Sequence, residues 1–286
     1  MTVREASDWA AGRLSGTPSP VTDAHLLLCS LRNWKRHEVF LNADSTLTPG
    51  ELRELSGMVE RRVSREPLQH ITGSTGFMGR EFRCGPSALV PRHETEILVE
   101  TLTGRLEADP GLIIDVGTGS GVVAISLALE YPEALVVGTD ISPAALELAR
   151  ENLDVHRPRN LSLVSADMLE AFRTDGTGSA DALVANLPYV PSEEIRTLQP
   201  EVSLWDPFVA LDGGSDGLGL VSRLLGAAAR HLKPGGLLAF EVGIGQAGRA
   251  AGMLSSIDGL WTDTVISRDL SGIERVVSAV LKGKGQ

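Results

Sequence analysis

The chain has 286 residues, an apolar fraction of 42% and a formal net charge of −11. This length and apolar content suit one large α/β domain together with a smaller one. The acidic charge argues against stable binding to nucleic acid, because proteins held by phosphate contacts need a basic surface. A local basic patch remains compatible with these numbers.

The number of cysteines and the hydropathy limit the cellular compartment and the kinds of site expected for this protein. Cys29 and Cys84 are the only cysteines, too few for a disulfide framework and without the paired spacing of a zinc site. The first residues lack an apolar leader, and no stretch approaches the roughly 20 apolar residues of a membrane span. We expect a cytoplasmic protein without a metal site or a membrane contact, and a monomer.

The N-terminal segment, residues 2–64, is predicted to be helical. Apolar residues recur at i, i+3 and i+4 spacings between residues 2 and 64, and two turn segments, 16–20 and 46–49, interrupt them. A small helical domain is therefore expected over residues 1–66. Its basic side chains belong either to a solvated face or to a surface that binds a partner; they are Arg32, Lys35, Arg36, Arg53, Arg61, Arg62 and Arg65.

The next segment, 67–92, contains short apolar runs broken by glycines and is predicted to form a β-hairpin linker. From residue 93 to residue 286, strand and helix patterns alternate, which predicts a mostly parallel sheet covered on both faces. The last two strands are joined by the short segment 269–272 and should pair antiparallel. The predicted strands are 112–116, 134–139, 161–166, 181–186, 236–242, 262–267 and 274–281.

A glycine-rich turn follows the first predicted strand of this domain. Glycines at this position allow a ligand to approach the backbone, and the next helix offers unpaired N–H groups. A dinucleotide fingerprint requires glycine or alanine three residues after Gly119, where this chain has Val122. The turn, Gly117-Thr118-Gly119-Ser120-Gly121, is therefore expected to bind a nucleoside without phosphates.

Acidic residues stand at the ends of the next two strands. Asp140 can accept hydrogen bonds from both hydroxyls of a ribose, and Asp167 can accept one from an adenine amino group. The alternatives are a solvated turn residue for Asp140, and a turn or helix cap for Asp167 with Met168 packing below. All these positions lie at the carboxyl edge of the sheet, where open α/β folds bind ligands.

The fourth predicted strand ends in the tetrapeptide Asn186-Leu187-Pro188-Tyr189. The Asn186 side-chain oxygen and the Leu187 carbonyl can accept both hydrogens of a planar NH2 group, and Pro188 restricts the direction of that carbonyl. Tyr189 can stack on the planar group with its hydroxyl left for a polar partner. The alternative is an ordinary Asn-x-Pro turn. With the glycine turn and Asp140 upstream, we predict S-adenosylmethionine chemistry on a planar nitrogen, without a general base.

These motifs resemble those of the PrmC/HemK family, the S-adenosylmethionine-dependent glutamine N5-methyltransferases of peptide chain release factors. The resemblance extends over nearly the whole chain. It rests on Glu66-Pro67-Leu68-Gln69, on Phe77, Gly79 and Phe82, on Pro91-Arg92-His93-Glu94-Thr95-Glu96, on the 115–121 loop, on Asp140, on Asn186 to Tyr189, on Ala210-Leu211-Asp212-Gly213-Gly214 and on Asp216-Gly217-Leu218.

The resemblance implies a class I methyltransferase domain, Rossmann-like, behind a helical domain that docks the release factor, and methylation of the glutamine in the factor's Gly-Gly-Gln loop. It implies that Asn186 serves both cofactor and substrate. The other implied cofactor residues are Asp115, Gly117, Thr118, Gly119, Gly121, Asp140, Asp167 and Met168. The other implied substrate residues are Leu187, Pro188, Tyr189, Phe77, Arg92 and Glu94.

Two positions depart from the family pattern: Leu187 and His93 each replace a proline. Three alternatives therefore stay open. The chain can be a paralogue that modifies another protein, or a protein that binds the cofactor without transferring methyl. It can also be an N6-adenine methyltransferase, because Asn-Leu-Pro-Tyr resembles the motif of rRNA adenine dimethyltransferases.

Overall fold

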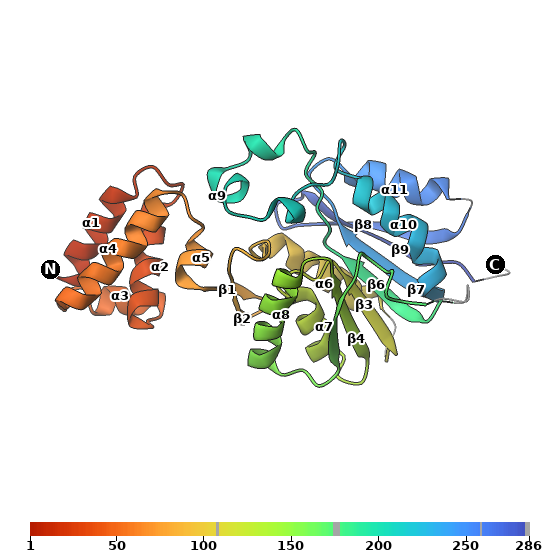
Figure 1. The fold of residues 1–286 in the computed structure, drawn as a ribbon, viewed down its shortest axis with the longest axis horizontal. Coiled ribbons are helices and arrows are strands. Elements are labelled where there is room, and N and C mark those ends of the chain that lie inside the picture. Colours follow the sequence, from red (N-terminus) through yellow and green to blue (C-terminus); the bar gives the residue numbers. More distant parts are fainter. Residues whose placement is uncertain (107–108, 174–177, 258, 284–286) are drawn as a thin grey trace. The chain divides into compact units, whose positions relative to one another are not determined.

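The computed structural model describes residues 1–106, 109–173, 178–257 and 259–283 (Figure 1). The chain divides into two compact units. The first consists of residues 1–74 together with 199–205, and the second of residues 75–198 and 206–286. None of the helices among the described residues is both long and apolar enough to cross a membrane.

The first unit is helical, as predicted, and its helices begin where the sequence supplies caps. Thr2 and Thr48 each form a capping box, with Glu5 and Glu51 respectively. One helix was not predicted: residues 68–72, expected as part of the linker, form a short helix that ends at Gly73 with φ +80°. The helices are α1 Val3–Arg13, α2 Pro20–Arg32, α3 Arg36–Leu41, α4 Pro49–Val63 and α5 Leu68–Thr72.

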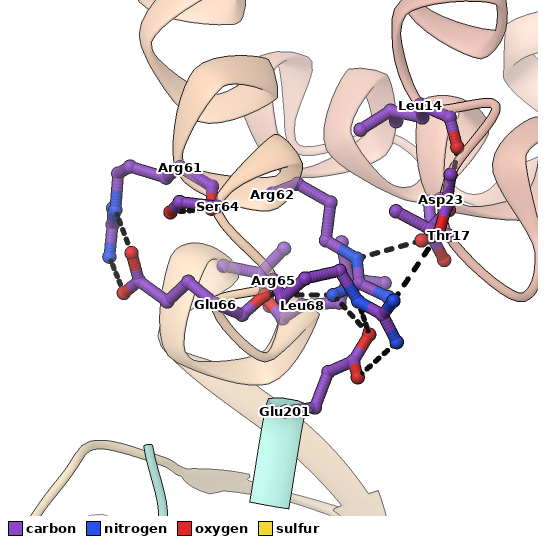
Figure 2. Close-up of polar contacts among 12 residues, drawn as sticks. Leu14, Thr17, Asp23, Arg61, Arg62, Ser64, Arg65, Glu66, Leu68 and Glu201 are labelled. Carbon is purple, nitrogen blue, oxygen red and sulfur yellow. Dashed lines mark hydrogen bonds and ion pairs between the residues drawn. The ribbon is translucent and has the colours of Figure 1, made fainter. Parts of the chain in front are cut away.

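A buried ion-pair cluster connects α2, α4 and the segment 199–205, which includes α9 (Pro200–Ser203) (Figure 2). Arg62 is only 5% exposed, and its guanidinium contacts Asp23 at 2.8 Å and Glu201 at 2.9 Å. Arg65 also donates to Glu201, at 2.7 Å. The expectation that Arg62 belongs to a solvated or partner-binding face is therefore wrong, because acidic partners distant in sequence bury it.

The second unit contains the predicted mostly parallel sheet, in the order β5-β4-β3-β6-β7-β9-β8. β9 runs antiparallel to both of its neighbours, β7 and β8, as expected from the short connection. The strands are β3 Leu112–Val116, β4 Leu135–Asp140, β5 Leu161–Ser165, β6 Ala180–Ala185, β7 Leu232–Glu241, β8 Trp261–Arg268 and β9 Glu274–Leu281. The predicted hairpin is also present, as β1 Ser74–Phe77 and β2 Arg80–Arg83.

Both faces of the sheet are buried, and the strands alternate between them. Ile113 and Val184 pack in one cluster with residues of α6 and α7, whereas Ile114 and Leu183 pack in the other with residues of α10 and α11. Burial on both faces explains the near-continuous apolar runs of these strands. The main helices are α6 Glu96–Arg105, α7 Val122–Glu130, α8 Pro143–His156, α10 Gly219–His231 and α11 Ala247–Ser256 (Figure 1).

Replacing Asp23 tests the buried cluster. In Asp23→Ala, Arg62 loses its closest carboxylate while it remains buried, so we expect the free energy of unfolding to fall by about 2 to 4 kcal/mol. The control is Asp44→Ala, which removes the surface pair of Arg4 and Asp44, with side chains 63% and 90% exposed; it should cost less than about 0.5 kcal/mol. Denaturant unfolding followed by tryptophan fluorescence measures both. Equal losses would contradict the assignment.

Candidate active site

The strand order reverses next to β3, and this places the two main motifs side by side. β3 pairs in parallel with β4 on one side and with β6 on the other, with Val116 opposite Ala185. The residues that follow these two, Gly117 and Asn186, therefore leave the sheet at the same edge. A Cβ atom on Gly117 would lie 3.0 Å from Cδ2 of Leu187. Such a reversal is where open α/β sheets bind ligands.

Hydrogen bonds to the neighbouring strand, β4, fix the backbone of the glycine turn. The N–H groups of Gly117 and Thr118 both donate to the carbonyl oxygen of Thr139, at 2.8 Å. Gly119 has φ +56°, and a Cβ atom there would meet only Ala88, at 4.0 Å. The backbone of Gly119 thus presents open space in which a ligand can approach it.

Two carboxylates accept hydrogen bonds from the turn, in different environments. Asp115 is 1% exposed and accepts hydrogen bonds from the Thr118 hydroxyl at 2.7 Å and from Ala124 N–H at 3.1 Å. Burial raises the pKa of Asp115 to about 7. Asp140 is partly exposed and accepts from the N–H groups of Gly119 and Ser142, both at 2.8 Å. The buried Asp115 carboxylate therefore bonds only to groups of the protein, whereas the Asp140 carboxylate is also accessible to solvent.

Asp167 and Met168 follow β5, the edge strand. Asp167 forms an ion pair with Arg223 of α10 at 2.8 Å. Met168 has φ +52° and packs in part against the core. A carboxylate that accepts one bond from a guanidinium keeps further lone pairs, so the pair with Arg223 leaves the predicted adenine contact possible.

At the end of β6, the carboxamide of Asn186 has a defined partner: its Nδ2 donates to Oγ1 of Thr95 at 3.0 Å. Leu187 is 6% exposed and packs in the core. Burial, together with the nearby carboxylate of Glu241, raises the pKa of Tyr189, so its hydroxyl stays protonated at neutral pH.

Thr95 and Glu241 were not among the predicted site residues. Glu241 is the last residue of β7 and is only 2% exposed. Burial raises the pKa of Glu241 to about 7, and among the described residues its Oε2 has no hydrogen-bond partner. The sequence did contain a signal, because Glu241 is the one charged residue in the predicted strand 236–242.

The backbone after Pro188 is held by a glutamine and by close glycines. Gln246 donates from Nε2 to the Tyr189 carbonyl at 2.8 Å and accepts at Oε1 from the N–H of Gly243, also at 2.8 Å. The N–H of Gly213 donates to the Val190 carbonyl at 2.9 Å. The Gly-Gly segment that contributed to the family resemblance therefore supports the strand end that carries Asn186.

The three predicted substrate residues outside the tetrapeptide lie in different surroundings. Phe77 is 1% exposed and packs edge-on against Phe82, in the core. Arg92 is partly exposed and pairs with Asp206 at 3.1 Å. Glu94 pairs with Arg275 at 3.4 Å. Arg92 and Glu94 thus offer accessible charge, whereas the Phe77 side chain is enclosed.

Comparison with known proteins adds independent information. The PrmC N-terminal domain family matches residues 5–73, and the methyltransferase small domain family matches residues 92–199. A release factor glutamine methyltransferase of Geobacter sulfurreducens is 39% identical over 278 residues, covering 96% of this chain and 95% of that protein. One of Moorella thermoacetica is 39% identical over 282 residues, covering 96% and 97%.

Solved structures with the same fold include a methyltransferase from Pyrococcus furiosus, with a TM-score of 0.54 and 15% identity, covering 81% of this chain and 98% of that one. A ribosomal protein methylase from Lactobacillus delbrueckii has a TM-score of 0.51 and 21% identity, covering 71% and 86%. Fold and family matches together define a Rossmann-like methyltransferase. More specifically, the identity over nearly the full length shows that the chain belongs to the release factor glutamine methyltransferase family.

Two glycines of the loop 213–217, which contacts the backbone after Pro188, give a matched pair of variants. Gly214 and Gly217 both have positive φ, +88° and +75°, but a Cβ atom on Gly214 meets nothing within 4 Å, whereas one on Gly217 would lie 2.3 Å from the Tyr189 carbonyl oxygen. Gly214→Ala should therefore cost only about 1 kcal/mol of backbone strain. Gly217→Ala should cost more and also lower methyl transfer at least tenfold, because the strand end must move. Unfolding and activity assays measure both; similar activities in the two variants would contradict this role.

Proposed function

We propose that the protein transfers a methyl group from S-adenosylmethionine to the side-chain nitrogen of a glutamine in peptide chain release factors. The observation that carries this proposal is the position of Asn186, at the sheet edge beside Gly117, with its NH2 group bonded to Thr95. This arrangement leaves the carboxamide oxygen as the acceptor available to a substrate amide. Family membership supports glutamine as the substrate.

The residues at the sheet edge suit the cofactor. Open space above Gly119 admits a nucleoside, and each oxygen of Asp140 accepts one backbone bond and keeps lone pairs for a ribose hydroxyl. Gly117, Thr118, Gly121, Asp115 and Met168 would shape the same site, with Asp167 toward the adenine. S-adenosylmethionine supplies a methyl group on a positively charged sulfur.

The substrate amide needs to be oriented, because its nitrogen lone pair is delocalised and nucleophilic attack requires alignment with the methyl group. Asn186 Oδ1 and the Leu187 carbonyl accept its two N–H hydrogens and stabilise the positive charge that develops on nitrogen. The carbonyl is available although leucine replaces the family's proline, since every residue has one. Tyr189 packs beside the amide plane, and the product releases its surplus proton to water.

We also propose roles for the helical unit and for the residues around the site. The helical unit, with the match to the PrmC N-terminal domain over residues 5–73, docks the release factor. Arg92 and Glu94 contact the substrate near the site, with Phe77 behind them. The protein acts as a cytoplasmic monomer and binds no nucleic acid stably. Both described cysteines are free, and burial raises the pKa of Cys84 to about 12, which makes this thiol unreactive.

A labelling experiment tests the substrate. Purified release factors are incubated with the protein and methyl-labelled S-adenosylmethionine, digested, and examined by mass spectrometry; we expect label on the Gly-Gly-Gln glutamine. Asn186→Ala should lower transfer at least a hundredfold, because the amide loses an acceptor, with cofactor affinity changed far less. Label on rRNA or DNA adenine in place of glutamine would refute the proposal, as would an unimpaired Asn186→Ala.

A second variant tests the cofactor site separately. Asp140→Ala removes the acceptors for the ribose hydroxyls, and each charge-assisted bond contributes about 1.5–3 kcal/mol. We expect the dissociation constant for S-adenosylmethionine to rise at least tenfold in calorimetric titration. Glu130→Ala, at the far end of α7, is the control and should bind normally. Unchanged affinity in Asp140→Ala would remove Asp140 from the site.

A further inference from the structure

An ion pair between Arg92 and Asp206 lies beside the candidate active site. Nη2 of Arg92 donates to Oδ2 of Asp206 at 3.1 Å. The side chain of Asp206 is 0% exposed, whereas that of Arg92 is 38% exposed. Burial raises the pKa of Asp206 to about 6, so its carboxylate is ionised at neutral pH. The acid is therefore enclosed by the protein, while the base that it holds stays accessible to solvent.

Arg92 is connected to Asn186 through Thr95. The carbonyl oxygen of Arg92 accepts a hydrogen bond from the N–H of Thr95 at 3.1 Å. Oγ1 of Thr95 in turn accepts from Nδ2 of Asn186 at 3.0 Å. A single short turn of backbone therefore separates Arg92 from the residue that contacts the Asn186 carboxamide.

Asp206 is connected to the other end of the tetrapeptide 186–189. It begins the segment 206–214, in which the carbonyl oxygen of Leu211 accepts from the N–H of Val190 at 3.0 Å. Val190 directly follows the tetrapeptide in sequence. The ion pair thus joins two segments of the chain, one of which holds the start of the tetrapeptide and the other its end.

Most hydrogen-bond donors of the Arg92 side chain remain available. A guanidinium carries five N–H donors in one plane. Within the part of the chain that the structure describes, this side chain forms one hydrogen bond, to Asp206. In the proposed substrate, the residues that precede the glutamine are glycines, so the acceptors that they present are main-chain carbonyl oxygens. A partly exposed guanidinium that is already held in place suits such acceptors.

We propose that Asp206 is a positioning residue that holds the Arg92 guanidinium beside the tetrapeptide, where it binds a main-chain carbonyl oxygen next to the substrate glutamine. This inference rests on the proposed function and deepens it, because it identifies what Arg92 recognises. The ion pair restricts the rotamers of Arg92 before the substrate arrives, so less conformational entropy is lost on binding. Asp206 therefore acts on substrate affinity through Arg92, and Asn186 acts on the amide itself.

Kinetics of paired variants test the role of Asp206. At saturating cofactor, Asp206→Asn should raise KM for the release factor at least tenfold, because a charge-assisted bond is lost, with kcat within threefold of wild type. Asp181→Asn is the matched control: its carboxylate pairs with Lys233 at 2.7 Å, at the opposite end of β6 from Asn186. Its KM should stay within twofold of wild type, and an equal KM in Asp206→Asn would overturn the proposal.

A double variant tests whether Asp206 acts through Arg92. Because Asp206 has no other role in substrate binding, Asp206→Asn combined with Arg92→Ala should have the KM of Arg92→Ala alone, within twofold. Affinity for S-adenosylmethionine should change less than twofold in all three enzymes, as measured by calorimetric titration. Effects on KM that multiply in the double variant would overturn the proposal.

Amide-to-ester replacement in the substrate tests what Arg92 binds, because an ester carbonyl is a weaker hydrogen-bond acceptor than an amide carbonyl. The linkages beside the glutamine are replaced one at a time in release factors made by peptide ligation. One replacement should raise KM at least fivefold with the wild-type enzyme and less than twofold with Arg92→Ala. Equal rises with both enzymes would overturn the proposal, as would a KM that responds only to neutralising an acidic side chain of the factor.

A readout without transfer separates this inference from the proposed function. The ¹⁵N order parameter of the Arg92 Nε–H group, assigned by its loss in Arg92→Ala, should be high in wild type and in Asp181→Asn, and lower in Asp206→Asn. An enzyme that fails to label release factors but shows this difference would refute the substrate while supporting the positioning role of Asp206. An active enzyme whose Arg92 is equally mobile in wild type and in Asp206→Asn would overturn the positioning role alone.

Discussion

The parallel pairing of β3 with β6 is the constraint on which the site depends. Val116 lies opposite Ala185, so the glycine turn and the Asn186 tetrapeptide, about seventy residues apart in sequence, leave the sheet at the same edge. Both strands are buried on two faces, and a shift of register by one residue would move every apolar side chain to the other face. The packing that stabilises the sheet thus also sets the geometry of the site.

Most of the buried polar groups at this edge have hydrogen-bond partners, whereas Oε2 of Glu241 has none among the described residues. Asp115 holds Thr118 and the start of α7, Gln246 holds the Tyr189 carbonyl, and Thr95 accepts from Asn186. Buried polar groups that lack partners are costly, whereas connected ones define a single arrangement. The raised pKa values of Asp115 and Glu241 are the electrostatic cost of placing carboxylates where water does not reach.

The helical unit also contains a buried charged side chain whose partners are carboxylates, and here the ion pairs anchor one segment of the chain to another. Arg62 is surrounded by Asp23 and Glu201, and Glu201 comes from a short segment that lies in sequence after the tetrapeptide. The chain therefore leaves the methyltransferase unit and contributes α9 to the helical unit before it returns at residue 206. A buried charge with well-placed partners is a specific anchor, because other side chains would leave the guanidinium unpaired.

Local patterns determined much of this protein. Apolar periodicity predicted the strands to within a few residues and the antiparallel last strand, and the order of glycine turn, acidic strand end and Asn-Leu-Pro-Tyr indicated a methyltransferase. Tertiary structure alone decided that Arg62 and Glu241 are buried, that residues 68–72 are helical and that Thr95 contacts Asn186. These features depend on contacts between residues far apart in sequence, and periodicity and spacing carry no information about which distant side chains meet.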